Sequence, residues 1–207
     1  MEPGIEQFVS ALTTHADDFA TQLHAEDFDR LSRYYELLMK WNARLHLVAP
    51  CSPSEFAVRH VLESLMLLNH LPIAATVTDV GSGGGLPIVP CLLVREDLHA
   101  SLIESSKRKA VFLREAVRAV EPIGRAHVTM GRFQETVSPP AGFVSCRALD
   151  RFTNLIPTLM SWAGPRATFL FFCGDELRAR LEPILSRPKI ERIPHSQGRF
   201  LVTGSQS

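Results

Sequence analysis

The chain has 207 residues, of which 45% are hydrophobic and 21% are charged, and its 22 acidic residues balance its 22 lysines and arginines. These proportions are those of an ordinary globular protein, and they indicate neither a disordered chain nor a membrane protein. A formal net charge of zero provides no overall attraction to nucleic acid, so any RNA binding has to depend on a local patch.

The cysteines and the N-terminal residues indicate the cellular compartment in which the protein is expected. The four cysteines are Cys51, Cys91, Cys146 and Cys173. They are too far apart to form the close pairs of a zinc site or a redox dithiol, so we expect reduced thiols and no metal. The first residues are acidic, without a basic start and an apolar run, and no apolar stretch reaches the roughly 18 residues of a membrane span. We therefore expect a cytoplasmic protein with no membrane partner.

The first 72 residues are predicted to be helical. From Asp27 to Leu47 apolar residues recur every three or four positions, which is the period of an amphipathic helix. A break at residues 50–54 separates this helix from a second one, Glu55 to Leu71, which Pro72 ends. We expect residues 1–72 to form a helical section that packs beside a main domain, residues 73–207, in one compact unit.

Beyond residue 72 the period changes, and short apolar strands alternate with helices. The β-branched run at residues 76–80 predicts a buried strand that leads into a tight turn. Further strands are predicted at residues 100–104, 126–130, 142–146 and 167–172, and helices from about residue 87, at 107–120 and at 152–163. This alternation predicts an α/β fold with a mostly parallel sheet. A final extended stretch, residues 200–203, is predicted to be an antiparallel edge strand.

A glycine-rich turn, residues 81–85, follows the first predicted strand. Glycine lets the backbone bend sharply and lets a ligand approach the main chain without side chains in the way. The second predicted strand ends in Glu104, about 20 residues further on, where a carboxylate can accept hydrogen bonds from both ribose hydroxyls of an adenosine. The turn and Glu104 together predict a site for a cofactor that contains adenosine.

The residues of the turn discriminate between two such cofactors. A dinucleotide favours the spacing G-x-G-x-x-G with its pyrophosphate at a helix N-terminus, whereas this turn has glycine at positions 81, 83, 84 and 85. Asp79 opens the turn, and its carboxylate would attract an ammonium group and repel a diphosphate. We therefore expect S-adenosylmethionine, whose amino acid moiety carries an ammonium.

Several motifs support a more specific assignment because they occur in a fixed order along most of the chain. They are residues 37–42 (LLMKWN), 59–65 (RHVLESL), 79–87 (DVGSGGGLP), 95–99 (REDLH), 102–105 (LIES) with Lys107, Lys109 and 112–114 (FLR), 131–132 (GR) and 145–148 (SCRA). In these motifs the chain resembles the bacterial RsmG (GidB) methyltransferases. The resemblance implies the Rossmann-like fold of class I methyltransferases that use S-adenosylmethionine. It also implies methylation of ring nitrogen 7 of a guanine in the 530 loop of 16S ribosomal RNA (rRNA), with the 16S rRNA or the small ribosomal subunit as partner.

The turn, Glu104 and this resemblance together give a set of candidate site residues. The predicted cofactor-binding residues are Asp79, Gly81, Ser82, Gly83, Gly85, Leu86, Glu104, Ser105, Phe133, Gln134 and Arg147. Arg59, His60 and Arg132 are candidates for contact with the substrate. No catalytic residue is predicted, because ring nitrogen 7 of guanine has a free lone pair and no proton to lose. Catalysis of such a transfer depends mostly on alignment.

Basic residues gather at 107–109, and Arg114 and Arg118 follow at helical intervals. Such a run is usually a solvated helix face, but here it is also the main candidate for RNA contact, with Arg59 and Arg95 as further candidates.

The chain departs from the family pattern at five places. They are His46, Glu63, Ile88, residues 149–151 (LDR) and Cys173, where asparagine, aspartate, glycine, Phe-Ala-Ser and lysine are usual. Other functions stay open on the sequence. They are a methyltransferase of the same fold that acts on a small molecule or a protein, a nucleotide-binding module without turnover, and a dehydrogenase.

Overall fold

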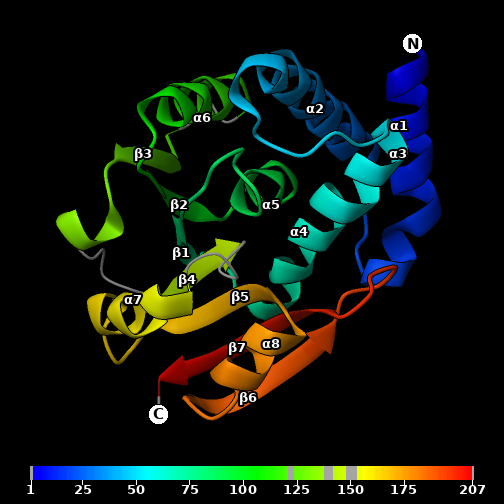
Figure 1. Ribbon diagram of the computed structural model, residues 1–207. Helices are drawn as coiled ribbons and strands as arrows, with labels where there is room; N and C mark the ends of the chain where they lie inside the picture. Colours follow the sequence, from blue (N-terminus) through cyan, green and yellow to red (C-terminus); the bar gives the residue numbers. More distant parts are fainter. Residues whose placement is uncertain (1, 121–123, 138–141, 148–152, 207) are drawn as a thin grey trace.

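A single sheet organises the fold of the described part of the chain, which comprises residues 2–120, 124–137, 142–147 and 153–206 of a computed structural model. Within these residues the sheet has seven strands in the order β3-β2-β1-β4-β5-β7-β6 (Figure 1). The strands are β1 Thr76–Val80, β2 His99–Glu104, β3 Ala126–Met130, β4 Phe143–Arg147, β5 Thr168–Gly174, β6 Leu185–Arg192 and β7 Arg199–Gln206. Strands β1 to β5 are parallel, and β7 is antiparallel to both β5 and β6. The predicted α/β fold with a mostly parallel sheet is therefore confirmed.

The strand order reverses at β1, because the chain proceeds outward through β2 and β3 and then returns to β4 on the other side of β1. In open α/β sheets a crevice forms at such a reversal, outside the carboxyl ends of the strands, and ligands bind there. The topology therefore directs attention to the carboxyl ends of β1, β2 and β4.

The helices lie in two groups. The N-terminal group comprises α1 Pro3–His15, α2 Ala25–Leu45, α3 Pro53–Phe56, the π-helix Ala57–Leu62, α4 Glu63–Leu65 and the 3-10 helix Met66–His70. The others follow strands and are α5 Ile88–Val94, α6 Lys107–Val120, α7 Ile156–Ala163 and α8 Asp175–Leu181. None of the helices in the described ranges is long and apolar enough to cross a membrane.

Two hydrophobic clusters cover the two faces of the sheet. The larger cluster joins Phe8 and Leu38 of the helical section to Leu170 and Phe172 of β5. The smaller one joins Phe169 and Phe171 of the same strand to α7 and α8. Successive β5 residues thus alternate between the clusters, as expected for a central strand with both faces buried. The helical section and the sheet share one core.

The structure corrects two predictions about elements and adds a strand that was not predicted. The single helix predicted from Glu55 to Leu71 is interrupted by the π-helix, and just beyond the π-helix the hydroxyl of Ser64 donates to the carbonyl of His60. The stretch 200–203 is antiparallel as predicted, but β7 is not at the edge, because β6 pairs with its outer side. Strand β6 was not predicted, because its sequence contains Pro188 and three basic residues. An edge strand with a bulge tolerates a proline and charged side chains.

Candidate cofactor and substrate site

The glycine turn lies at the crevice predicted by the topology, directly after β1. The backbone N–H of Gly81 donates to the carbonyl of Ile103 at 2.9 Å, which fixes the turn against β2. Gly81, Gly83 and Gly85 have φ angles of 75°, 53° and 85°, in the left-handed region that favours glycine. A Cβ at Gly85 would lie 2.6 Å from Cγ2 of Val89, whereas one at Gly81 would meet nothing within 4 Å. Packing therefore requires glycine at position 85, and open space adjoins position 81.

The helical section holds this turn in place. Tyr34 of α2 is fully buried, and its hydroxyl donates to the carbonyl of Gly84 at 2.5 Å. Burial raises the pKa of the Tyr34 hydroxyl well above its usual range, so the group stays protonated and can donate. The turn is thus fixed by β2 on one side and by α2 on the other.

Asp79 is buried at the end of β1 with one carboxylate oxygen unpartnered. Asp79 is 1% exposed, and its Oδ1 accepts a hydrogen bond from Ser145 Oγ at 2.7 Å. Oδ2 is buried and has no hydrogen-bond partner among the described residues. Burial raises the pKa of Asp79 to about 7, and the nearby charge of Glu104 acts in the same direction. A buried acceptor without a donor suits a cationic ligand group such as an ammonium.

Glu104, at the end of β2, binds the backbone of two turns. Its Oε2 accepts from the N–H of Gly83 at 2.9 Å and its Oε1 from the N–H of Ser106 at 2.7 Å, and the residue is 6% exposed. Each carboxylate oxygen has a second lone pair, so both can also accept a ligand hydroxyl. The prediction that Asp79, the turn and Glu104 lie together agrees with this arrangement.

The remaining predicted cofactor residues lie around this centre with different exposure. Leu86 and Phe133 are each 8% exposed, and Phe133 belongs to the same hydrophobic cluster as Val80 and Ile103. The Phe133 ring packs edge-on against Trp162 with centroids 5.5 Å apart. Ser82 is buried, with its hydroxyl donating to the carbonyl of Asp79. Ser105, Arg132 and Gln134 are exposed at the strand ends.

A buried ion cluster adjoins the crevice on the β4 side. Arg147 Nη2 donates to Glu63 Oε2 at 2.9 Å and to the carbonyl of Arg59 at 2.6 Å. Arg199 of β7 contacts the same carboxylate, with Nη1 at 2.9 Å from Oε2 and Nη2 at 2.5 Å from Oε1. We call Glu63, Arg147 and Arg199, with the adjoining Arg59 and His60, the Glu63 cluster. The roles of Glu63 and Arg199 in it were not predicted from the sequence, although Glu63 lies within the motif at residues 59–65.

His60 is held neutral within this cluster. Burial, reinforced by the charges of Arg147, Arg59 and Arg199, lowers the pKa of His60 to about 3. Its Nδ1 is buried and meets no hydrogen-bond partner in the part of the chain that the structure describes, and its ring packs on Phe56 with centroids 5.1 Å apart. His60 lies on the π-helix, a distortion that is frequent at functional sites. The imidazole is thus a neutral hydrogen-bonding group with one unused nitrogen.

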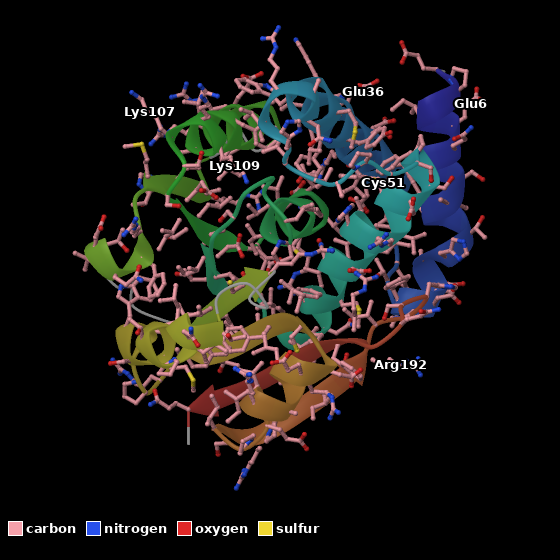
Figure 2. All side chains as sticks on the ribbon, in the orientation of Figure 1. Glu6, Glu36, Cys51, Lys107, Lys109 and Arg192 are labelled. Atoms are coloured by element: carbon pink, nitrogen blue, oxygen red, sulfur yellow. The ribbon has the colours of Figure 1, made fainter. Side chains whose placement is uncertain are left out.

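The basic residues predicted to contact RNA differ in their surroundings. Lys107, Arg108, Arg114 and Arg118 are exposed on α6, and Figure 2 shows Lys107 on the outside of the molecule. Arg59 is exposed and pairs with Glu55 at 2.9 Å. Arg95 differs from these, because its guanidinium donates to Asp97 and to the carbonyls of residues 71 and 72, at the amino end of β2. It has a structural role at the opposite end of the sheet from the glycine turn.

Three of the five departures from the family pattern are buried. Ile88 is completely buried at the start of α5, Cys173 is 4% exposed near the end of β5, and Glu63 is 1% exposed in the Glu63 cluster. His46 is exposed, and residues 149–151 lie outside the described residues.

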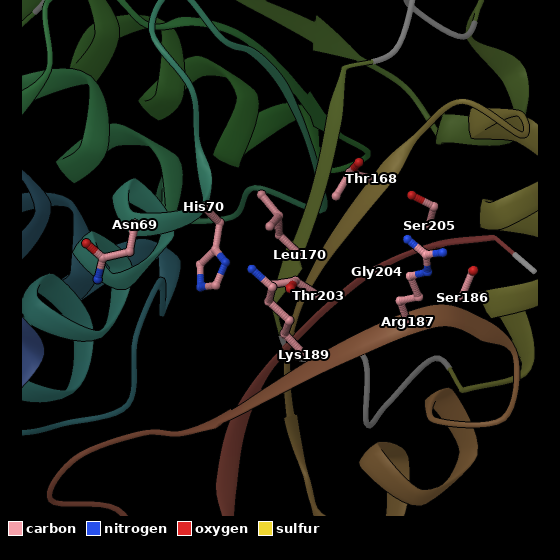
Figure 3. A pocket seen from close by; sticks show the side chains of 10 residues that line it. All are labelled: Asn69, His70, Thr168, Leu170, Ser186, Arg187, Lys189, Thr203, Gly204 and Ser205. Carbon is pink, nitrogen blue, oxygen red and sulfur yellow. The ribbon is translucent and has the colours of Figure 1, made fainter.

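A separate hollow of about 530 Å³ lies at the amino end of β5. It is lined by Asn69, His70, Thr168, Leu170, Ser186, Arg187, Lys189, Thr203, Gly204 and Ser205. In Figure 3 His70 lies on one side and the β6 side chains of Lys189 and Arg187 on the other. The cofactor crevice is at the carboxyl ends of the parallel strands, so this hollow is not part of it.

The chain matches one protein family over most of its length. A profile of GidB, described as rRNA small subunit methyltransferase G, matches residues 27–204. The chain is 37% identical over 165 residues to ribosomal RNA small subunit methyltransferase G of Gluconobacter oxydans, covering 78% of this chain and 82% of the relative. It is 35% identical over 180 residues to the protein of the same name from a Bradyrhizobium species, covering 85% and 81%.

Solved structures of low sequence identity share the fold. A SAM dependent methyltransferase from Aquifex aeolicus aligns with a TM-score of 0.54 at 19% identity, over 75% of this chain and 94% of that one. A ribosomal protein L11 methylase from Lactobacillus delbrueckii subsp. bulgaricus aligns with a TM-score of 0.56 at 14% identity, over 72% and 79%. The Rossmann-like methyltransferase fold expected from the sequence is confirmed.

Proposed function

Because the chain belongs to the GidB family of rRNA small subunit methyltransferase G, we propose that it methylates ring nitrogen 7 of a guanine in the 530 loop of 16S rRNA. The chain is an S-adenosylmethionine-dependent rRNA methyltransferase. The observation that carries the proposal is the unpartnered carboxylate oxygen of Asp79, which lies at the crevice next to Glu104 and the Glu63 cluster. We expect the protein to act in the cytoplasm, where ribosomal subunits are assembled.

The residues present fit this cofactor. Asp79 Oδ2 would accept from the ammonium of the amino acid moiety, and Glu104 would accept from the ribose hydroxyls. Gly81 leaves open space beside the main chain, so a ligand can approach the backbone there. S-adenosylmethionine supplies the sulfonium methyl group. The other residues that we propose to bind the cofactor are Ser82, Gly83, Gly85, Leu86, Ser105, Phe133, Gln134 and Arg147.

Positioning would supply most of the catalysis. A guanine ring nitrogen 7 needs no general base, and aligning two reactants can lower a barrier by about 7–11 kcal/mol in favourable cases. In the Glu63 cluster Arg147 is held by two acceptors, and neutral His60 has a free ring nitrogen. These two side chains would orient the base. The carbonyl oxygen at position 6 of guanine is the natural acceptor for an arginine.

The rRNA backbone would bind across exposed arginines and lysines. We propose α6, with Lys107, Arg108, Arg114 and Arg118, as the main contact, and Arg59 and Arg132 as contacts closer to the crevice. Phosphate contacts depend strongly on salt, and each one removed lowers the salt dependence of binding. Reversing the charges of Arg114 and Arg118 should therefore weaken RNA binding and leave cofactor binding unchanged. If the variant loses cofactor binding to the same extent as RNA binding, α6 is not a specific RNA contact.

The experiment uses small ribosomal subunits from cells that lack the gene. The purified protein and labelled S-adenosylmethionine are added, and the rRNA is digested and its nucleosides analysed by mass. We expect one 7-methylguanosine per subunit within the fragment that contains the 530 loop, and no transfer by the Asp79→Asn variant. Methylation at another nucleotide, or of a protein or small molecule only, would overturn the proposed target. Absence of S-adenosylhomocysteine binding by calorimetry, with NAD bound instead, would overturn the cofactor site itself.

A further inference from the structure

Three possible metal ligands meet where the end of α1 approaches the loop between β6 and β7. His15 ends α1, Asp18 follows in the 3-10 turn Ala16–Phe19, and His195 belongs to the loop between β6 and β7. Figure 1 shows this loop reaching the end of α1. His15 Nδ1 lies 3.2 Å and His195 Nε2 lies 2.8 Å from Asp18 Oδ2. None of these three residues belongs to the glycine turn or to the Glu63 cluster.

The spacing of these atoms fits a tetrahedral cation. All three lie within 4.8 Å of one another. Zinc bonds of about 2.0–2.1 Å with tetrahedral angles hold neighbouring ligand atoms roughly 3.3–3.4 Å apart. The two histidine–aspartate separations differ from this by about half an ångström or less, and the histidine rings already lie with their centroids 4.8 Å apart. Small side-chain rotations would bring the three atoms into a coordination shell.

The backbone presents His195 in a defined way. Its φ is 54°, an unusual conformation for a residue other than glycine. The loop is closed by two hydrogen bonds, from the N–H of Ile193 to the carbonyl of Arg199 at 2.9 Å and from Ser196 Oγ to the carbonyl of Ile193 at 2.6 Å. The ring of His195 also lies 6.0 Å from that of buried Phe19. These contacts hold the loop, and with it the His195 side chain, in place next to Asp18.

We propose that His15, Asp18 and His195 bind a zinc-like divalent cation. Two imidazoles and one carboxylate are the ligand types that zinc and neighbouring transition metals take, whereas magnesium and calcium prefer oxygen ligands throughout. A water molecule would complete the shell, since the three side chains are 33%, 47% and 44% exposed. The cation would link α1 to the β6–β7 loop, and that loop leads directly into Arg199 of the Glu63 cluster. Its role would therefore be to hold the end of α1 against the β6–β7 loop and so to fix Arg199 of the Glu63 cluster.

Metal binding to the full-length, chelator-treated protein tests the proposal. We expect one equivalent of Zn²⁺ by calorimetry, the visible absorption of tetrahedral cobalt with Co²⁺, and a melting temperature several degrees higher with Zn²⁺. His195→Gln and Asp18→Asn should each lower the affinity at least tenfold. Mg²⁺ should not compete.

Two matched variants separate this site from other metal-binding groups. His127→Gln removes an exposed histidine on β3, and Cys51→Ser removes the most accessible of the four cysteine side chains. Both should bind Zn²⁺ like the wild type. The proposal is wrong if His195→Gln and His15→Gln, verified as folded by circular dichroism, keep wild-type affinity. It is also wrong if Cys51→Ser abolishes binding, or if the wild type shows no saturable binding and Asp18 serves only as an ion-pair partner of the two histidines.

Discussion

Replacing Glu63 by glutamine removes the only carboxylate that the described structure places between Arg147 and Arg199 while keeping the shape of the side chain. Glu63 is 1% exposed and contacts both guanidiniums at distances of 2.5 to 2.9 Å. After the substitution two cations face each other without their shared counter-ion. The Arg147 side chain is only 18% exposed, so water cannot replace the lost carboxylate around it.

The size of the effect follows from this burial. Breaking a buried ion pair by removing one partner costs about 3–5 kcal/mol. Arg199 is 30% exposed and can regain some hydration, so we expect the lower end, about 3 kcal/mol. An unfolding entropy of about 2.1 cal/mol/K per residue, applied to 207 residues, gives roughly 0.43 kcal/mol/K. The melting temperature should therefore fall by about 7 °C.

Glu55→Gln is the matched control for this experiment. Glu55 also pairs with an arginine at 2.9 Å, but the two side chains are 47% and 51% exposed. An exposed pair contributes at most about 1 kcal/mol, so the melting temperature of the Glu55→Gln variant should differ from that of the wild type by about 2 °C or less. Thermal unfolding followed by circular dichroism compares the two variants. If Glu63→Gln is no less stable than Glu55→Gln, the argument from burial is refuted.

Three further predictions concern the glycine turn and its neighbours. Burial raises the pKa of Asp79 to about 7, so the cofactor-free wild type should lose about 3 kcal/mol relative to Asp79→Asn between pH 4 and 7 in urea unfolding, because the unfolded chain releases this proton near pH 4. A constant difference over that range would contradict the assignment. Gly81→Ala should lower S-adenosylhomocysteine affinity at least tenfold in calorimetry and cost about 1–2 kcal/mol of stability, because φ there is 75°. Gly85→Ala has the same backbone strain and also places its Cβ 2.6 Å from a valine methyl, so it should destabilise the protein by several kcal/mol. Tyr34→Phe leaves the carbonyl of Gly84 without its donor and should cost about 1–3 kcal/mol in denaturant unfolding; an unchanged midpoint would show that this bond does not hold the turn.

Local pattern was sufficient for most of the parallel sheet. The bounds of β1, β3 and α6 are those predicted, and β2 and β4 agree within one residue, because these elements have a local pattern of β-branched or periodic apolar residues. The helix α1 was not singled out, although Ile5, Phe8 and Leu12 have helical spacing behind Pro3. Strand β6 was concealed by its proline and charges, which only an edge position tolerates.

The sequence by itself determined the turn, its acidic partner and the methyltransferase family. A strand, a cluster of glycines and a carboxylate one strand later are close in the chain, and the regular geometry of a parallel sheet brings their ends together. Only the tertiary structure decided what surrounds them. Glu63 meets Arg147 and Arg199 across 84 and 136 positions, and His195 meets Asp18 across 177. Such contacts depend on how the helical section packs on the sheet, and packing of distant segments leaves no period in the local sequence.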